Sequence, residues 1–159
     1  ELEAAGGQDW GEALPVLAAA DDVLVVGRGL GLGAAQEAAL KLKETAALHA
    51  EAFSAAELRH GPLALLRAGL PVVALSQEDA TRAGVLELVR ELRGKGARVL
   101  LAEEGAAVAG RLPVPPGMHP ALAPMAMIRS FYALASDVAR ARGLDPDRPQ
   151  HLSKVTRTR

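Results

Sequence analysis

Lysine, glutamate and histidine side chains are concentrated in one stretch, LKLKETAALHAEAFSAAELRHGP, which runs from residue 40 to residue 62. The chain has four lysines against fourteen arginines, and two of the lysines, Lys41 and Lys43, lie here. Two of its four histidines and three glutamates lie here as well. Glutamate can act as a base and a lysine amine can attack a carbonyl carbon, whereas arginine keeps its charge. The stretch is therefore the first candidate for acid–base or imine chemistry.

Glu37, Lys41 and Glu44 are spaced so that they share one face of a helix with a 3.6-residue period. Such a row can be a solvated ladder of ion pairs, worth about a few tenths of a kcal/mol each. It can also hold a carboxylate beside a lysine as a positioned general base. Spacing alone leaves both interpretations open. His60 precedes a Gly-Pro pair, which predicts a turn that can hold an imidazole at the surface, although a single histidine can equally be structural.

The elements that would position these residues alternate along the chain. Short apolar runs that end in turn residues predict four buried parallel strands, at 21–29, 70–79, 97–105 and 110–115. Amphipathic stretches between them predict helices at 34–48, 80–95 and 120–142. This alternation implies an α/β fold: a doubly wound parallel sheet with helices on both faces, a flavodoxin-like three-layer sandwich.

Two further expectations follow from this fold and from local patterns. Residues near 50 are expected to be helical, and the capping-box pattern of Ser54 and Glu57 predicts an additional short helix. Ligands of a doubly wound sheet bind beyond the carboxyl ends of its strands. We therefore expect the ion-pair row, which follows the first strand, to lie on that side of the sheet.

A glycine-rich turn, GRGLGLGA, follows the first predicted strand. It contains a variant of the dinucleotide fingerprint, which also needs an acidic residue about 20 positions further on, at the end of the next strand. Since the next predicted strand starts near residue 70, dinucleotide binding is disfavoured. We expect instead a tight turn at Gly27 and Gly29, where the backbone can approach a substrate closely.

Ser76 and Thr81 flank the expected start of the helix after the second strand. Hydroxyl and amide groups at a helix N-terminus suit a phosphate, so both residues are candidate substrate contacts. The alternative is that Ser76 or Asp79 caps the helix, which is the more common role of such residues.

Composition excludes several kinds of site. With no Cys, the chain has no thiolate nucleophile, no disulfide and no Cys-ligated metal. His49-Ala-Glu51 and Glu57-x-x-His60 each supply only part of a known metal motif, so neither a metal nor a cofactor is expected. The net charge of −1 gives no reason to expect nucleic acid or a membrane surface as a partner. No apolar run approaches the roughly 18 residues of a membrane span, and no signal-peptide pattern is present, so we expect a cytoplasmic protein.

The block AALKLKETAALHAEAFSAAELRHGPLALL closely resembles the signature of the sugar isomerase (SIS) fold family, together with the strand VVGRG before it and the tail DRPQHLSKVT after it. The resemblance is to the second SIS domain of glucosamine-6-phosphate synthases and of their glutaminase-lacking relatives, such as glucosamine-6-phosphate deaminases. It spans most of the chain. It implies a connector in residues 1–20, an SIS domain in 21–142 and a C-terminal active-site tail in 143–159.

The resemblance also implies roles for individual residues. Glu44 corresponds to the carboxylate that moves a proton between C1 and C2 of the open-chain sugar, and Lys41 to a lysine near the developing enolate oxygen. His60 corresponds to a histidine that opens the sugar ring in the active site of a partner subunit, which implies a homodimer. Lys154 matches the tail lysine that forms a Schiff base with the keto sugar. Glu37, on the same helix face as Glu44, is counted with the substrate contacts.

The implied activity is the interconversion of fructose 6-phosphate and glucosamine 6-phosphate, which synthases and deaminases of this family run in opposite directions. In the family the sugar phosphate is held mainly by a first SIS domain, which this chain lacks. We therefore expect the chain to be the C-terminal half of a two-domain enzyme. The rival hypothesis is a non-catalytic SIS module that binds a sugar phosphate as a sensor, which would need neither a base nor an imine-forming lysine.

Overall fold

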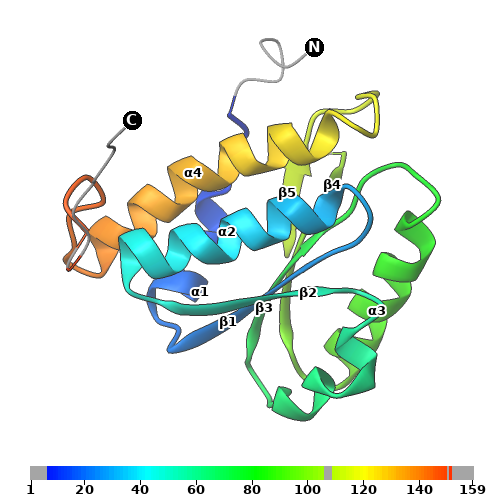
Figure 1. Ribbon diagram of the computed structural model, residues 1–159, viewed down its shortest axis with the longest axis horizontal. Helices are drawn as coiled ribbons and strands as arrows, with labels where there is room; N and C mark the ends of the chain where they lie inside the picture. The colour runs from blue at the N-terminus through cyan, green and yellow to red at the C-terminus, as the bar shows by residue number, and fades with distance from the viewer. Residues whose placement is uncertain (1–6, 106–108, 150, 152–159) are drawn as a thin grey trace, which may run out of the picture.

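Five parallel strands form the central sheet of the computed structural model, in the order β2-β1-β3-β4-β5 (Figure 1). They are β1 (Asp22–Gly27), β2 (His49–Ser54), β3 (Pro71–Leu75), β4 (Arg98–Glu104) and β5 (Arg111–Val114). The structure describes residues 7–105, 109–149 and 151. Every residue of β3 is buried, as expected for a strand that is covered on both faces. The strand order is that of a flavodoxin-like sheet, which confirms the predicted fold class.

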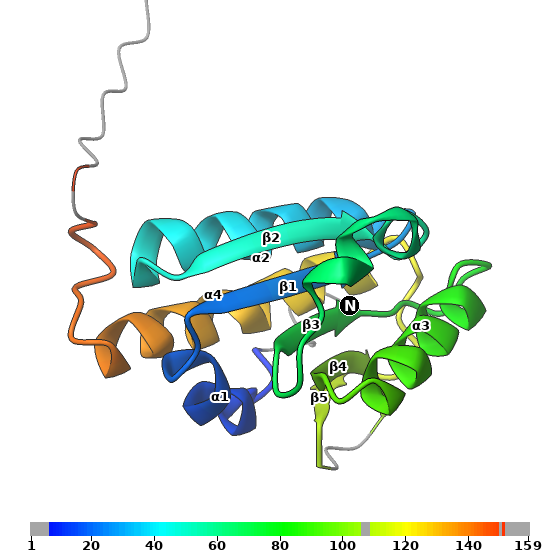
Figure 2. The ribbon, with the colours of Figure 1, turned by 90° about the horizontal axis from the view of Figure 1, so that it is seen from below.

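Helices cover both faces of the sheet (Figure 2). One face packs against α1, α2 and α4, and the other against α3 and two short 3-10 helices. These elements are α1 (Leu14–Ala18), α2 (Gly31–Ala46), α3 (Arg82–Gly94), α4 (Ala123–Ala141) and the 3-10 helices Gly11–Ala13 (ahead of α1), Leu58–His60 and Pro62–Leu65. Successive strand residues alternate between the two cores: Val23 and Val25 pack with α2 and α4, whereas Leu24 and Val26 pack with α3.

The prediction of helix near residue 50 is wrong, because His49–Ser54 forms β2, which pairs with β1 along its whole length. Alanine and glutamate favour helices and are depleted in strands, so local propensity does not indicate this strand. α2 ends at Ala46 because Ala47 takes a left-handed conformation, with φ of 47°. Leu48 alone then separates Ala47 from the strand. Pairing with β1, and not the local sequence, makes this segment a strand.

The remaining predicted elements are confirmed with shorter or shifted ends. The four predicted strands correspond to β1, β3, β4 and β5, and the three long helices to α2, α3 and α4. The short helix predicted from Ser54 is instead a turn that leads into the 3-10 helix Leu58–His60, and Ser54 does not cap that helix.

Trp10 anchors the residues that precede the sheet. Its side chain is 2% exposed and its ring meets the edge of Phe131 of α4, with 6.4 Å between centroids. Its indole N–H donates to the carbonyl of Pro113 in β5 at 2.9 Å. From Trp10 onwards, the segment expected to be a connector therefore packs into the same core as α4.

Candidate active site

Glu37, Lys41 and Glu44 form a charged cluster on α2, called here the α2 cluster. The Lys41 Nζ donates to Glu44 Oε2 at 2.5 Å and lies 3.6 Å from Glu37 Oε1. The three side chains are 29–33% exposed, so each is partly sheltered yet accessible. The predicted grouping of these residues on one helix face is thus confirmed, and the ammonium lies on the carboxylate that was assigned as base.

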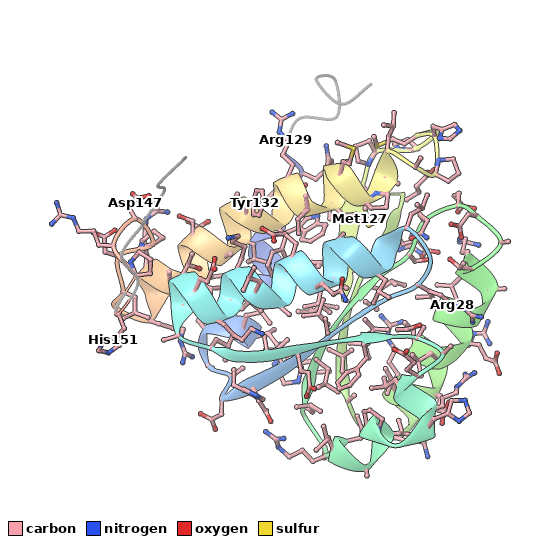
Figure 3. All side chains as sticks on the ribbon, in the orientation of Figure 1. Arg28, Met127, Arg129, Tyr132, Asp147 and His151 are labelled. Carbon is pink, nitrogen blue, oxygen red and sulfur yellow. The ribbon has the colours of Figure 1, made fainter. Side chains whose placement is uncertain are left out.

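Tyr132 of α4 joins the α2 cluster, although sequence reasoning missed it (Figure 3). Its hydroxyl donates to Glu37 Oε1 at 2.9 Å across the α2–α4 contact. No periodicity relates two residues on different helices. The available signal was composition, because Tyr132 is the only tyrosine in a chain with 3% aromatic residues.

The surroundings of the cluster change two pKa values. The hydrogen bond to Glu44 raises the pKa of the Lys41 ammonium, with Glu37 adding to the effect and burial opposing it. Burial raises the pKa of the Tyr132 phenol, and so does its bond to the negatively charged Glu37. Lys41 is therefore held in its charged form and Tyr132 in its neutral form.

α2 carries the cluster away from the edge of the sheet where ligands were expected. The helix starts next to the carboxyl end of β1 and runs back along the sheet. At 1.5 Å per residue, Glu44 lies about 20 Å from the start of α2 at Gly31. The expectation of a carboxyl-edge site is therefore wrong for Glu44, which lies near the opposite end of the helix.

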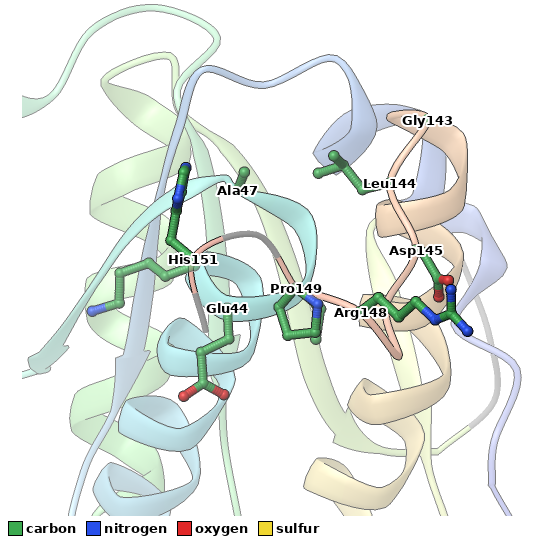
Figure 4. Close-up of a pocket in the computed structure, with 10 residues that line it drawn as sticks. Glu44, Ala47, Gly143, Leu144, Asp145, Arg148, Pro149 and His151 are labelled. Carbon is green, nitrogen blue, oxygen red and sulfur yellow. The ribbon is translucent and has the colours of Figure 1, made fainter. Parts of the chain in front are cut away.

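A pocket of about 430 Å³ lies beside Glu44, between the end of α2 and the chain that follows α4 (Figure 4). Lys43, Thr45 and Ala47 line it from one side, and residues after α4 line it from the other: Gly143, Leu144, Asp145, Arg148, Pro149 and His151. The C-terminal segment thus borders the candidate base, as an active-site tail would. Lys154 lies outside the described residues.

The glycine turn after β1 packs against its own chain. A Cβ at Gly27 would lie 2.3 Å from the carbonyl oxygen of Gly31, so glycine is required there, and the φ of +58° at Gly29 favours glycine at that position. The next strand along the chain is β2, so the spacing argument used against dinucleotide binding does not hold. β2 contains Glu51, but its last residue is Ser54, so no acidic residue stands at the end of the strand, where the fingerprint needs one.

The loop between β3 and α3, residues Ser76–Thr81, is called here the β3–α3 loop. The Asp79 carboxylate accepts hydrogen bonds from the Thr81 amide at 2.7 Å, the Thr81 hydroxyl at 2.6 Å and the Gln77 Nε2 at 2.9 Å. Burial raises the pKa of Asp79, but the hydrogen bonds from Thr81 and Gln77 outweigh it and the net pKa is lowered. Asp79 therefore takes the Thr81 and Gln77 donors that could have bound a phosphate. The capping alternative is wrong, because the N-cap residue of α3 is Thr81 and no side chain caps that helix. Contact of Ser76 or Thr81 with substrate stays a prediction.

His60 lies far from Glu44 in the fold. It ends the 3-10 helix Leu58–His60, whose Leu58 packs with α3, whereas α2 covers the other face of the sheet. The imidazole is exposed, and Gly61 follows with φ of 151°. One copy of the chain thus does not bring His60 to the α2 cluster. Its predicted action in a partner subunit stays a prediction.

Two features are absent from the described residues, 7–105, 109–149 and 151. No group of three or more His, Asp or Glu side chains there is arranged to hold a metal ion. Likewise, none of the helices within that part of the chain has the length and apolar character needed to cross a bilayer.

Comparison with known proteins gives one family. The SIS domain family model matches residues 16–103. The glutamine–fructose-6-phosphate aminotransferase (isomerizing) of Symbiobacterium thermophilum is 43% identical over 148 residues, which are 90% of this chain and 24% of that protein. The chain therefore spans about a quarter of the length of this relative.

Two solved structures have the same fold. The C-terminal domain of glucosamine-fructose-6-phosphate aminotransferase from Francisella tularensis is 30% identical, with a TM-score of 0.72 over 82% of this chain and 38% of that one. Glucosamine-6-phosphate deaminase from Thermotoga maritima is 27% identical, with a TM-score of 0.66 over 91% of this chain and 44% of that one.

Proposed function

The chain belongs to the SIS domain family, and we propose that it is the isomerase domain of an aminosugar-phosphate enzyme. The proposed reaction interconverts fructose 6-phosphate and glucosamine 6-phosphate. The observation that carries the proposal is the 2.5 Å contact between Lys41 and Glu44 on an accessible face, beside a pocket bordered by the C-terminal segment. A positioned carboxylate next to a fixed positive charge is what a proton shift beside a carbonyl requires.

Glu44 acts in this proposal as the base. Its carboxylate takes a proton from one carbon of the open-chain sugar and returns it to the neighbouring carbon, C1 or C2 depending on direction. Lys41 stabilises the negative charge that develops on the sugar oxygen meanwhile. Because Glu44 raises the pKa of Lys41, that amine stays protonated and is a poor nucleophile.

We assign the imine-forming role to Lys154, as the family resemblance implies. Lys154 follows His151, a residue of the pocket lining, by three positions. A neutral lysine amine can add to the keto carbon with loss of water, and arginine cannot replace it. His60 opens the sugar ring in the site of a second copy, since within one copy it lies on the other face of the sheet.

Completion of the site requires a further SIS domain. The solved relatives have chains more than twice as long as the part that this chain matches. An apolar groove between α2 and α4, lined by Leu30, Met125 and Ile128 among others, adjoins Glu37. Leu30 and Met125 are 59% and 53% exposed, which supports a covering domain on this face. As the family resemblance implies, the sugar phosphate would then be bound mainly by that domain, and the occupation of the Thr81 and Gln77 donors by Asp79 supports this.

The test uses the full-length protein that contains this chain. It is incubated with glucosamine 6-phosphate while ammonia and fructose 6-phosphate are followed, and then with fructose 6-phosphate and glutamine. Glu44→Gln should lower the rate of sugar isomerisation by about 10²–10⁴-fold, the range for loss of a general base. Glu51→Gln, the same change at an exposed residue of β2, is the matched control.

An unchanged rate in Glu44→Gln would refute the assignment of the base. Turnover in neither direction, with the sugar phosphate still bound, would favour the sensor module instead. Ammonia release would identify a deaminase, and synthesis with glutamine a synthase.

A further inference from the structure

Four side chains on α2 and α4 form one continuous row of polar contacts. The Tyr132 hydroxyl donates to Glu37 Oε1 at 2.9 Å, the same oxygen lies 3.6 Å from Lys41 Nζ, and Lys41 Nζ donates to Glu44 at 2.5 Å. Two carboxylates thus compete for one ammonium. The neutral phenol contacts only one of them.

The outcome of this competition is the opposite of what an isolated helix favours. A glutamate four residues before a lysine is the better-oriented pair in a helix. That pair is Glu37 and Lys41. In the structure, however, the short contact is between Lys41 and Glu44. Tyr132 supplies a reason, since its hydrogen bond already neutralises part of the charge on the Glu37 oxygen that faces Lys41.

The position of Tyr132 relative to α2 is fixed by contacts at the ends of the helices. Arg142, just after α4, donates through Nε to the carbonyl of Ala46 at the end of α2, at 2.9 Å, and through Nη1 to the carbonyls of Ala18 and Ala20. On α2 itself, the Thr45 hydroxyl donates to the carbonyl of Lys41 at 2.7 Å. The bond from Arg142 to Ala46 holds the end of α4 against the end of α2, and the Tyr132–Glu37 bond joins the same two helices further along.

We propose that Tyr132 is a positioning residue: by donating to Glu37 it keeps that carboxylate from drawing Lys41 away, so that the ammonium stays on Glu44. The coupling along the row does not depend on any reaction. Its bearing on catalysis rests on the proposed function, since it keeps the base and the charge that stabilises the oxyanion side by side.

The single tyrosine gives a direct measurement. Phenolate absorbance in the 159-residue chain reports Tyr132 alone. Glu44→Gln should release Lys41 towards Glu37 and thereby lower the pH at which Tyr132 titrates by a few tenths of a pH unit. In a Lys41→Met background the same Glu44→Gln change should have no effect, because the connecting residue is absent. A double-mutant cycle separates this coupling from a direct effect of charge.

The controls make either outcome decisive. Glu87→Gln, on α3 across the sheet, should leave the Tyr132 titration unchanged in both backgrounds. A Tyr132 titration that ignores Glu44→Gln when Lys41 is present would overturn the proposal. So would a shift that persists unchanged in Lys41→Met. The four side chains are partly exposed, so these variants are expected to fold, and Trp10 fluorescence checks that they do.

A second readout addresses catalysis in the full-length protein. Tyr132→Phe should lower kcat by about 10–100-fold, the size expected for one hydrogen bond to a charged group, with KM little changed. A loss that appears in KM alone would contradict positioning of the base. If the titration shows the coupling but no isomerisation occurs even in the wild type, the proposed function fails and the row of contacts stands.

Discussion

The α2 cluster and the β3–α3 loop contain similar polar groups that differ in their exposure to solvent. In the α2 cluster, three charged side chains are about one third exposed and two carboxylates share one ammonium. In the β3–α3 loop, Asp79 satisfies three donors of its own chain, and Ser76 and Gln77 are almost fully buried. The charged groups of the α2 cluster are accessible to a ligand. The Asp79 carboxylate, in contrast, is bonded to Thr81 at the start of α3.

This difference indicates which polar groups serve function. Both regions follow a strand and a turn, and both were candidates from their residue types. Their exposure separates them, because the α2 side chains are 29–33% exposed, whereas Ser76 and Gln77 are each 1% exposed. Substitutions in the two regions should therefore have opposite effects on activity and stability.

Lys41→Met tests the functional half of this comparison and should give the largest effect. In the full-length protein, kcat/KM for isomerisation should fall by about 10²–10³-fold, as for removal of a group that stabilises an oxyanion. The free energy of unfolding should change by less than about 1 kcal/mol, because the ion pairs lost are partly exposed. Lys95→Met, at the end of α3, is the matched control for loss of a lysine. Equal losses of rate in the two variants would remove the distinction.

Asp79→Asn tests the structural half. The substitution should destabilise the fold by about 1–3 kcal/mol, because an amide N–H₂ in place of the accepting oxygen would face the Gln77 Nε2 donor and replace a charge-assisted hydrogen bond with a donor–donor contact. Urea denaturation measures the change. Asp137→Asn, an exposed position on α4, controls for loss of a carboxylate charge. If Asp79→Asn is no less stable than that control, the β3–α3 loop is not held by its own carboxylate.

The pH dependence of the free energy of unfolding should also distinguish the two regions, by smaller amounts than the substitutions themselves. Because the pKa of Asp79 is lowered from 3.8, its contribution is complete above that value and is lost as the pH falls through the lower value in the folded state. Because the pKa of Lys41 is raised from 10.5, its contribution is complete below that value and is lost as the pH rises through the higher one. Wild type and Asp79→Asn should thus converge in acid, and wild type and Lys41→Met in base. Convergence at the opposite ends would contradict these assignments.

The sequence predicts the parts of the fold that depend on local pattern. β-branched runs indicate β1 and β3, and apolar periodicity indicates α3 and α4. The face shared by Glu37, Lys41 and Glu44 follows from helical spacing, and the structure confirms it. What fails depends on contacts between distant segments. The bond from Tyr132 to Glu37 joins residues 95 positions apart, and neither helix alone indicates it.

The position of the site shows a second limit. Doubly wound sheets bind ligands at their carboxyl edge, and this rule directs attention to Gly29, Ser76 and Thr81. The resemblance of the chain to SIS domains directs it to Glu44, at the other end of α2. The length of α2, which the helical periodicity predicts approximately, shows that Glu44 lies about 20 Å from the start of the helix at that edge.

β2 has a consequence for how the chain folds. Its residues, HAEAFS, favour a helix, and they continue directly from α2 through Ala47. In the denatured ensemble, before β2 can pair with β1, fluctuating helical structure is expected to run past Ala46 into these residues. Folding then brings Ala47 into its left-handed conformation and pairs His49–Ser54 with β1. The segment between Glu44 and His60 therefore reaches its native conformation only when β2 joins the sheet.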